Sequence, residues 1–143
     1  MSALLTNQFV WVPLLAWAIG QILKVVTDSW RQHRLSLRTL GMSGGMPSSH
    51  TALTVCLTTV VARKVGLGSP LFAAVAILTM VVVYDATGVR RAAGQQSVIL
   101  NQVLDDLRSN LGFRYERLRE FIGHTPYEVF AGALLGVAVG LLL

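Results

Sequence analysis

Two short segments of the chain carry histidines in settings that suit acid–base or nucleophilic chemistry. The first is residues 44–50, Gly-Gly-Met-Pro-Ser-Ser-His, whose glycines and proline predict a sharp loop that ends just before a helix. Ser48 or Ser49 can cap that helix, and the free N–H groups of its first turn attract anions, phosphate above all. His50 lies in the same turn and can give or take a proton near neutral pH. The alternative for this loop alone is a serine cap with a bystander histidine.

The second segment is residues 123–128, Gly-His-Thr-Pro-Tyr-Glu, at the predicted start of another helix. His124 and Glu128 are four residues apart there, so their side chains lie on one helix face. A carboxylate in that position can accept the second N–H of the imidazole, fix its tautomer and raise its basicity, which prepares a histidine as a nucleophile or base. The same spacing also fits an ordinary contact on a helix surface. Its combination with the His50 loop favours chemistry.

An acidic residue also stands at the edge of an apolar run, in the segment Tyr-Asp-Ala-Thr-Gly-Val-Arg-Arg at 84–91. This residue is Asp85, and an acid at the edge of a membrane helix is typically paired or functional. Arg90 or Arg91 can reach back to it around Gly88. The alternative is an ordinary ion pair at a helix end.

The helices that must position these residues have the composition of a membrane protein. Of the 143 residues, 53% are apolar and only 13% are charged, the mean hydropathy is +0.59, and the charges leave long uncharged runs. We therefore predict an all-α, multi-pass integral membrane bundle that forms a single domain over residues 1–143. Its predicted spans are residues 9–26, 50–66, 70–88 and 126–143. A soluble bundle with buried hydrophobic helices is the alternative.

The segment between the third and fourth spans, residues 92–123, is polar and charged but keeps a helical period. It predicts one or two amphipathic helices that lie on the membrane or against the bundle. The period is carried first by Leu100, Val103, Leu104, Leu107 and Leu111, and then by Leu118, Phe121 and Ile122. The last span carries Gly132, Gly136 and Gly140 at four-residue spacing, which lets another helix approach closely. That stripe suits an internal contact or a homodimer.

Four spans bring alternate helix ends to the same side of a membrane. The shared side collects the residues with chemistry: Lys24, Arg31, His50, Asp85, Arg90, Arg91, His124 and Glu128. It also holds ten of the twelve Lys and Arg residues, all except Arg63 and Lys64, so the positive-inside rule predicts that this face is cytoplasmic. The net charge of +5 then matches anionic lipid headgroups and indicates no nucleic-acid partner.

Together the three segments resemble the phosphatidic acid phosphatase type 2 superfamily, which is related to the vanadium haloperoxidases. The small divergent membrane branch of that superfamily is the best match, and the resemblance covers nearly the whole chain. In the wider family, a lysine and an arginine seven residues later bind phosphate. Lys24 and Arg31 have this spacing, with Gln32 in place of the proline that follows in the family. Residues 47–50 match the family's Pro-Ser-Gly-His, with serine for glycine, and the resemblance implies that Ser48 and Ser49 donate to phosphate.

The third family motif is Ser-Arg, five residues, His, three residues and Asp. By this resemblance His124 is the nucleophile and Glu128 is the acid that orients it, one methylene longer than the family's aspartate. The Ser-Arg pair is missing from this chain. We infer that Arg90 or Arg91 supplies the missing cation, with Asp85 as a supporting residue.

The mechanism that the resemblance implies needs neither a metal nor another cofactor. His124 attacks the phosphorus and forms a phosphohistidine, while His50 protonates the departing alkoxide. Lys24, an arginine and the N–H groups at the helix start stabilise the phosphoryl oxygens. The implied substrate is a membrane lipid phosphate or a prenyl diphosphate, because the site opens at the depth of the headgroups. The sequence does not identify which lipid it is.

Three other functions are weighed against this one. The serine-for-glycine change and the missing Ser-Arg pair favour a catalytically inactive relative that binds a lipid headgroup or acts in membrane assembly. A metal-dependent hydrolase built from the residues His50, Asp85, His124 and Glu128 would lose its activity in a chelator. A transporter is disfavoured, because four spans with nearly all their charge at one surface offer no path across the membrane.

Overall fold

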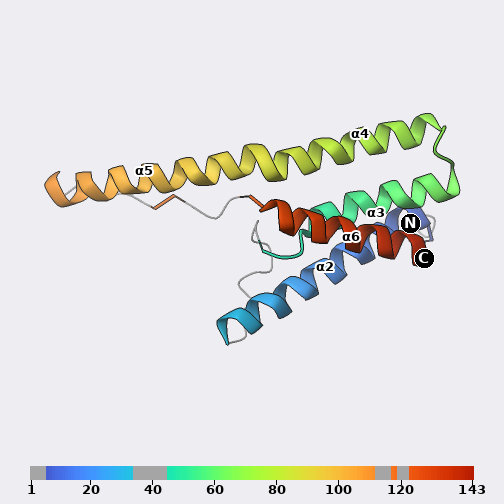
Figure 1. The fold of residues 1–143 in the computed structure, drawn as a ribbon, viewed down its shortest axis with the longest axis horizontal. Helices are drawn as coiled ribbons and strands as arrows, with labels where there is room; N and C mark the ends of the chain where they lie inside the picture. The colour runs from blue at the N-terminus through green and yellow to red at the C-terminus, as the bar shows by residue number, and fades with distance from the viewer. Residues whose placement is uncertain (1–5, 34–44, 112–116, 119–122) are drawn as a thin grey trace.

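The structure is a computed structural model that describes residues 6–33, 45–111, 117–118 and 123–143. Every regular element in these residues is helical, as the sequence predicts. In chain order the elements are α2 (Gln8–Gln32), α3 (Ser49–Lys64), α4 (Pro70–Tyr84), the π-helical turn η2 (Asp85–Val89), α5 (Arg90–Leu111) and α6 (Pro126–Leu142). Figure 1 shows α2, α3, α4 and α6 gathered in one half of the molecule, with α5 extending away from them.

Helix α3 is the centre of this bundle, because α2, α4 and α6 each pack against it. Its residues Cys56 and Val60 form the core together with Val12 and Ala16 of α2 and Val139 of α6. All of these side chains are small, so the helices lie close together. The predicted span at 50–66 therefore corresponds to the most enclosed helix of the bundle, and this helix carries His50 in its first turn.

The glycine stripe of α6 brings the backbones of α6 and α3 into contact. A Cβ added to Gly136 would lie 2.6 Å from the carbonyl oxygen of Ala52, and one added to Gly140 would lie 2.8 Å from Cβ of Thr59. Gly132 meets α3 just as closely one turn earlier, at its N-cap. The structure thus uses the stripe for an internal contact. A homodimer stays a prediction, and it would need another face because α3 covers these glycines.

Helix α2 begins at the N-cap Asn7 and ends at His33, whose φ of 50° is left-handed. It continues past the predicted limit at residue 26, because residues 27–32 include neither glycine nor proline and do not interrupt a helix. The hydroxyl of Thr27 donates to the carbonyl of Met46 at 2.7 Å. This bond fixes the loop before α3 to the end of α2.

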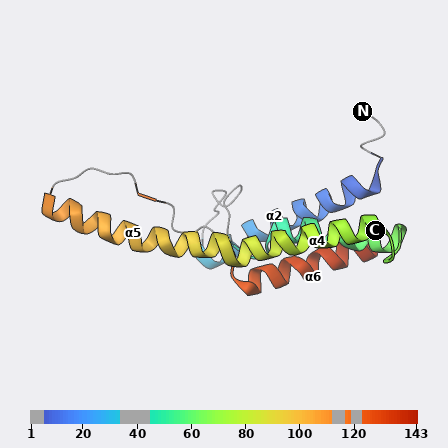
Figure 2. The same ribbon diagram turned by 90° about the horizontal axis from the view of Figure 1, so that it is seen from above.

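Helices α4 and α5 join through η2 into one straight rod, which both views in Figures 1 and 2 show. The prediction placed the end of this span at residue 88, but the helix continues through Gly88. A single glycine inside a helix costs only about 1 kcal/mol, so it does not end one. The predicted amphipathic segment is thus a direct continuation of the third span, and the element that α5 chiefly contacts is η2, its neighbour in the chain. The predicted second short helix falls largely outside the described residues.

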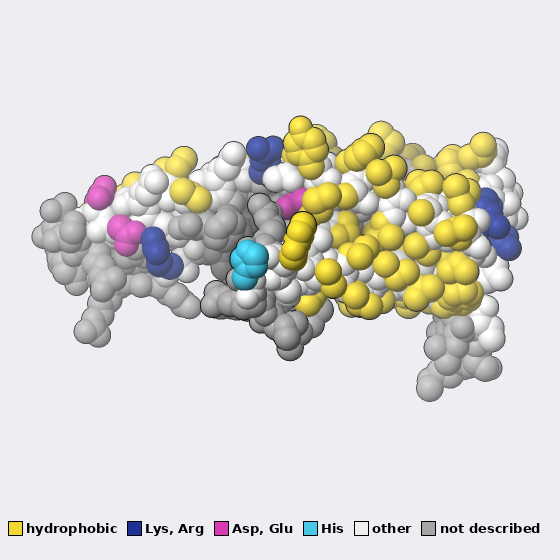
Figure 3. All heavy atoms as spheres, turned by 60° about the horizontal axis from the view of Figure 1, so that its bottom comes forward, with side chains coloured by type: hydrophobic (Ala, Val, Ile, Leu, Met, Phe, Trp, Pro, Cys, Tyr) yellow, Lys and Arg dark blue, Asp and Glu magenta, His cyan; other side chains and the backbone are white. Residues whose placement is uncertain are grey.

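Two helical stretches are long and apolar enough to cross a membrane: Gln8–Trp30, with a mean hydropathy of 1.8, and Pro70–Leu107, with 1.9. Helix α6 is also apolar but shorter. Helix α4 has no fully buried side chain, although part of its surface is half-buried against α3. Figure 3 shows a broad apolar surface over the half of the molecule that holds the bundle, with Lys and Arg side chains at both of its ends.

The alternating topology brings four helix ends together, as predicted. The Thr27 bond joins the end of α2 to the loop before α3. The backbone N–H of Ser48 donates to the carbonyl of Glu128 at 3.0 Å, which joins the starts of α3 and α6. The backbone N–H of His124 donates to the carbonyl of Ala86 at 3.0 Å, which joins α6 to η2. The start of α3, which carries His50, is therefore hydrogen-bonded to the start of α6, and His124, just before α6, is hydrogen-bonded to η2.

Candidate active site

The start of α3 is built by its own serines. Ser48 is the N-cap, and its hydroxyl is hydrogen-bonded to the N–H of Thr51 at 3.5 Å and to the Thr51 hydroxyl at 2.9 Å. Ser48 has no exposed surface, and Ser49 is 4% exposed and packs against Gly20 of α2. Both side chains are thus buried at the helix start, and a role for them in binding phosphate stays a prediction. His50, the next residue, lines the pocket that is described below.

His124 lies just before α6 and is held by the residues of that helix start. Its Nδ1 is 3.1 Å from Oε2 of Glu128, as the four-residue spacing predicts. The same carboxylate oxygen accepts the N–H of Thr125 at 2.9 Å and completes a capping box. Because an ionised carboxylate only accepts hydrogen bonds, the proton of His124 is on Nδ1 and the lone pair is on Nε2. Nε2 is therefore the atom available for attack.

Burial controls the protonation of His124. The side chain is 7% exposed, and this desolvation lowers its pKa below the ordinary value of 6.5. The hydrogen bond to Glu128 and its negative charge act in the opposite direction, and the charges of Lys24 and His50 lower the pKa further. At neutral pH the imidazole is accordingly neutral, which is the form that a nucleophile needs.

The junction of η2 and α5 carries an ion pair between a carboxylate and a guanidinium. Oδ2 of Asp85 accepts a hydrogen bond from Nε of Arg90 at 2.6 Å. The prediction that an arginine reaches back to Asp85 is therefore confirmed, and the arginine is Arg90. Arg91 differs, because it lies outside the pocket and its backbone packs against Gly123.

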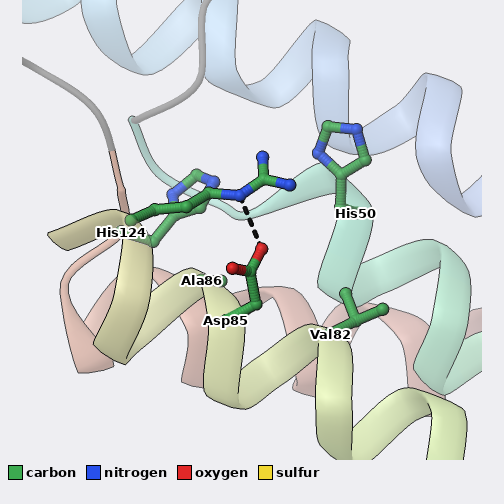
Figure 4. A pocket seen from close by; sticks show the side chains of 6 residues that line it. His50, Val82, Asp85, Ala86 and His124 are labelled. Atoms are coloured by element: carbon green, nitrogen blue, oxygen red, sulfur yellow. Dashed lines mark hydrogen bonds and ion pairs between the residues drawn. The ribbon is translucent and has the colours of Figure 1, made fainter. Parts of the chain in front are cut away.

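These groups line one pocket of about 160 Å³. Its walls are His50 of α3, Val82 of α4, Asp85 and Ala86 of η2, Arg90 of α5, and His124. Figure 4 shows His50 and His124 on opposite sides of the ion pair that Asp85 makes, which is drawn as a dashed line. The pocket thus combines a neutral histidine with a free Nε2, a second histidine and a guanidinium. That set can perform nucleophilic substitution at an anionic centre.

Similarity to known proteins agrees with the motifs in this pocket. The chain matches the model of the Divergent PAP2 family over residues 5–139. It belongs to the Divergent PAP2 family. A relative in this comparison is the uncharacterized membrane protein YuiD of Bacillus subtilis (strain 168), which is 36% identical over 98% of this chain and 96% of its own length. No solved structure matches the chain. The chain is therefore a membrane protein of the divergent PAP2 branch.

Not every residue that the family resemblance singled out lines the pocket of this Divergent PAP2 protein. Lys24 is 2% exposed and lies beneath Gly45, whose φ of 91° is left-handed and whose added Cβ would be 2.7 Å from Cε of Lys24. Its charge adds to desolvation, the larger cause, in lowering the pKa of His124. The side chain of Arg31 lies outside the described residues. Glu128 is not among the residues that line the pocket, and it contacts Nδ1 of His124.

Two pocket residues carry no chemical signal in the sequence and were missed. Val82 forms an apolar wall one turn before Asp85, and Ala86 contributes a backbone carbonyl to His124. The helical period places Val82 on the face of Asp85, so this wall could have been found. The role of Ala86 depends on the π-helical turn, which the sequence does not reveal. Among the described residues, no three His, Cys, Asp or Glu side chains cluster closely enough to hold a metal ion.

Proposed function

We propose that this protein is a membrane lipid phosphatase that hydrolyses a lipid phosphate monoester or diphosphate through a phosphohistidine. One observation carries the proposal: a buried, neutral His124 held by Glu128 shares a pocket with His50 and Arg90. The membership in the Divergent PAP2 family supports it, because the wider superfamily is one of phosphatases.

The reaction follows from the positions of the two histidines. Nε2 of His124 donates its lone pair to phosphorus while the bond from phosphorus to the leaving oxygen breaks. The leaving alkoxide takes the proton of His50, which becomes neutral. Neutral His50 then takes a proton from water, the hydroxide attacks phosphorus, and the bond from phosphorus to His124 breaks. For a phosphate monoester the balance is one water consumed, with one alcohol and one inorganic phosphate released. For a diphosphate attacked at its terminal phosphorus, the leaving group is the lipid monophosphate in place of the alcohol. Arg90 carries the charge of the phosphoryl oxygens in both steps.

The surroundings of the pocket support a lipid substrate. Tyr84 and Tyr127 precede Asp85 and Glu128 directly in the chain, and their side chains are 72% and 81% exposed. Aromatic residues of this kind concentrate at the boundary between the hydrocarbon core and the headgroups. Val82 extends the pocket toward the apolar surface of α4. On this basis we propose that α2, α3, α4 and α6 cross the membrane and that the pocket faces the cytoplasm at headgroup depth, open to a lipid phosphate or a prenyl diphosphate.

A second candidate is a catalytically inactive protein that binds a lipid headgroup. The observation that favours it is the burial of Lys24, Ser48 and Ser49 away from the pocket, because these are the residues that the resemblance assigns to phosphate. Such a protein would use Arg90 and the histidines to hold a phosphate without turning it over.

One experiment separates the candidates. The purified protein is incubated in chelator with phosphatidate, phosphatidylglycerophosphate and prenyl diphosphates, beside His124→Ala, and phosphate release is measured. A phosphatase releases phosphate in chelator, and His124→Ala reduces the rate by about 10³-fold or more. No release from any substrate, by folded protein that still binds these lipids, contradicts the phosphatase and favours the binding protein. Release that chelator abolishes would favour a metal-dependent hydrolase instead.

A further inference from the structure

The rod formed by α4 and α5 has one irregularity, and it lies in the pocket wall. Within η2 the N–H of Arg90 donates to the carbonyl of Asp85, five residues earlier. In a regular α-helix the same N–H would bond to the carbonyl of Ala86, four residues earlier. Single π-helical turns of this kind are frequently found at functional sites. This one changes the hydrogen bonding of the residues around it in two ways.

Its first effect is on the backbone of His124. Because Arg90 donates its N–H to Asp85, the carbonyl of Ala86 loses its α-helical partner and accepts the N–H of His124 instead, at 3.0 Å. Gly123 lies directly on the same part of the rod, since its added Cβ would be 2.6 Å from the backbone N of Arg91. The peptide that carries His124 is thus attached to the irregular turn.

Its second effect is on the side chain of Arg90. Residues five apart in an α-helix are separated by about 140° around the axis, so they cannot pair across one turn. A hydrogen bond between residues five apart places the later residue above the earlier one. Arg90 therefore stands over Asp85, and its Nε is 2.6 Å from Oδ2. The π-helical turn makes this ion pair and directs it into the pocket.

The ion pair with Asp85 leaves the two Nη groups of the Arg90 guanidinium available to a ligand. Asp85 occupies only Nε, and the two Nη groups of Arg90 have no hydrogen-bond partner among the residues that the structure describes. The planar fork of two Nη groups matches two oxygens of a phosphoryl group. With Nε fixed by Asp85, the orientation of that fork is fixed as well, between His50 and His124.

We propose that Asp85 is a positioning residue that acts through Arg90, and that η2 aligns Arg90 with His124 around one phosphoryl group. This inference rests on the proposed binding and hydrolysis of a phosphate ester. It distinguishes Arg90 from Arg91 as the cation that takes the place of the missing Ser-Arg pair. It also gives the carboxylate of Asp85 a role in a pocket for anions, where an unpaired carboxylate would repel the ligand.

A double-mutant cycle tests this proposal. Arg90→Ala is expected to raise both KM and the inhibition constant for inorganic phosphate about tenfold or more, because charged hydrogen bonds to the phosphoryl group are lost. Asp85→Ala is expected to raise the same constants several-fold, whereas Asp85→Asn, which keeps an acceptor for Nε, has a smaller effect. Asp85→Ala combined with Arg90→Ala is expected to be no worse than Arg90→Ala alone.

The chain provides a matched control on the same rod. Asp105 pairs with Arg117 at 2.9 Å, in an exposed position outside the pocket. Asp105→Asn is expected to leave KM and the inhibition constant unchanged. The melting temperature of each variant is measured in parallel, and it should change little, because exposed ion pairs contribute little to stability. Normal kinetics in Asp85→Ala, or effects of Asp85 and Arg90 that simply add, would overturn the proposal.

The proposal can fail separately from the phosphatase function. If wild-type protein releases no phosphate from any lipid, the same variants are compared by calorimetric titration with inorganic phosphate alone. Binding that Asp85→Ala weakens only when Arg90 is present supports the positioning role in a protein that does not turn phosphate over. A wild-type protein that neither hydrolyses lipid phosphates nor binds inorganic phosphate overturns both proposals.

Discussion

The backbone N–H of Ser48 donates to the backbone carbonyl of Glu128 at 3.0 Å. Ser48 is the N-cap of the helix that carries His50, and Glu128 is the residue that holds His124. The two histidines are therefore positioned relative to each other by a main-chain bond, in addition to the side-chain contacts. Substitutions that separate these two helix starts should affect activity even where they leave both histidines intact.

Glu128→Gln is expected to shift the pH dependence of phosphate release. Burial holds the pKa of His124 below 6.5 and Glu128 raises it, so removing the charge lowers the pKa further. Activity is lost on the acid side as His124 becomes protonated, so the acid limb of kcat/KM lies below pH 6.5 and should move to still lower pH in the variant. The plateau should fall by about 10²-fold or more, because a neutral amide no longer stabilises the positive charge that the imidazole gains as it attacks phosphorus. A pH series of initial rates measures both effects.

The variant is chosen because glutamine keeps the helix cap. Its side-chain oxygen can still accept the N–H of Thr125, so the start of α6 should be preserved. Circular dichroism and the melting temperature check this point. An acid limb that stays at the wild-type pH would contradict the role of Glu128.

Gly123→Ala is expected to remove most of the activity. The φ of Gly123 is 118°, a region that favours glycine, and an added Cβ would lie 2.6 Å from the backbone N of Arg91. The loop must move away from η2, and the bond from His124 to Ala86 is lost with it. We expect kcat to fall by about tenfold or more with a smaller change in KM, because misplacing a catalytic group raises the barrier more than it weakens binding. Wild-type kinetics in this variant would show that the contact with η2 is not needed.

Gly136→Ala is expected to destabilise the bundle. The new Cβ would lie 2.6 Å from the carbonyl oxygen of Ala52 and 2.9 Å from the backbone N of Cys56, so α6 and α3 must separate. Overpacking of this kind costs about 1–3 kcal/mol. Thermal unfolding in detergent measures the change. Gly68→Ala is the matched control, because nothing lies within 4 Å of its added Cβ, and it should unfold at the wild-type temperature. Equal melting temperatures for the two variants would contradict the close contact.

The orientation of the pocket can be tested with single cysteines. Cys56 is the chain's one cysteine and is buried, so Cys56→Ala provides the background. Gly68→Cys places a thiol in the turn at the end opposite the pocket, and Gln95→Cys places one on the exposed part of α5. An impermeant maleimide should label Gly68→Cys in intact cells and Gln95→Cys only after permeabilisation, because ten of twelve cations lie on the pocket side. The reverse pattern would invert the orientation, and labelling of both in intact cells would contradict two ends across a membrane.

Features that depend on local spacing were predicted well. The pairing of His124 with Glu128 follows from four residues of helix. The meeting of the four helix ends follows from the alternation of the predicted spans. Each of these features depends only on helix geometry and chain direction, and the hydropathy pattern predicts both the helices and their order along the chain.

Features that depend on contacts between distant segments were not predicted. The π-helical turn forms where the carbonyl of Ala86 finds a partner in His124, and nothing near Ala86 in the sequence indicates that partner. The choice of Arg90 over Arg91 follows from the same turn. The burial of Lys24 depends on Gly45 closing over it, which spacing along the chain does not reveal. The family resemblance assigns Lys24 to phosphate from its position in a motif, and a motif carries no information about how deeply the side chain is buried.

The pocket wall formed by Val82, Asp85, Ala86 and Arg90 is part of the continuous rod of α4, η2 and α5, so a movement of α5 is transmitted to it. Helix α5 continues for 22 residues beyond η2, which corresponds to a length of about 33 Å. A sideways force on the far end of α5 therefore exerts its torque at η2, where the hydrogen bonding is irregular and Asp85, Ala86 and Arg90 meet the histidines. Whatever anchors α5 outside the bundle also sets the angle at which the guanidinium enters the pocket.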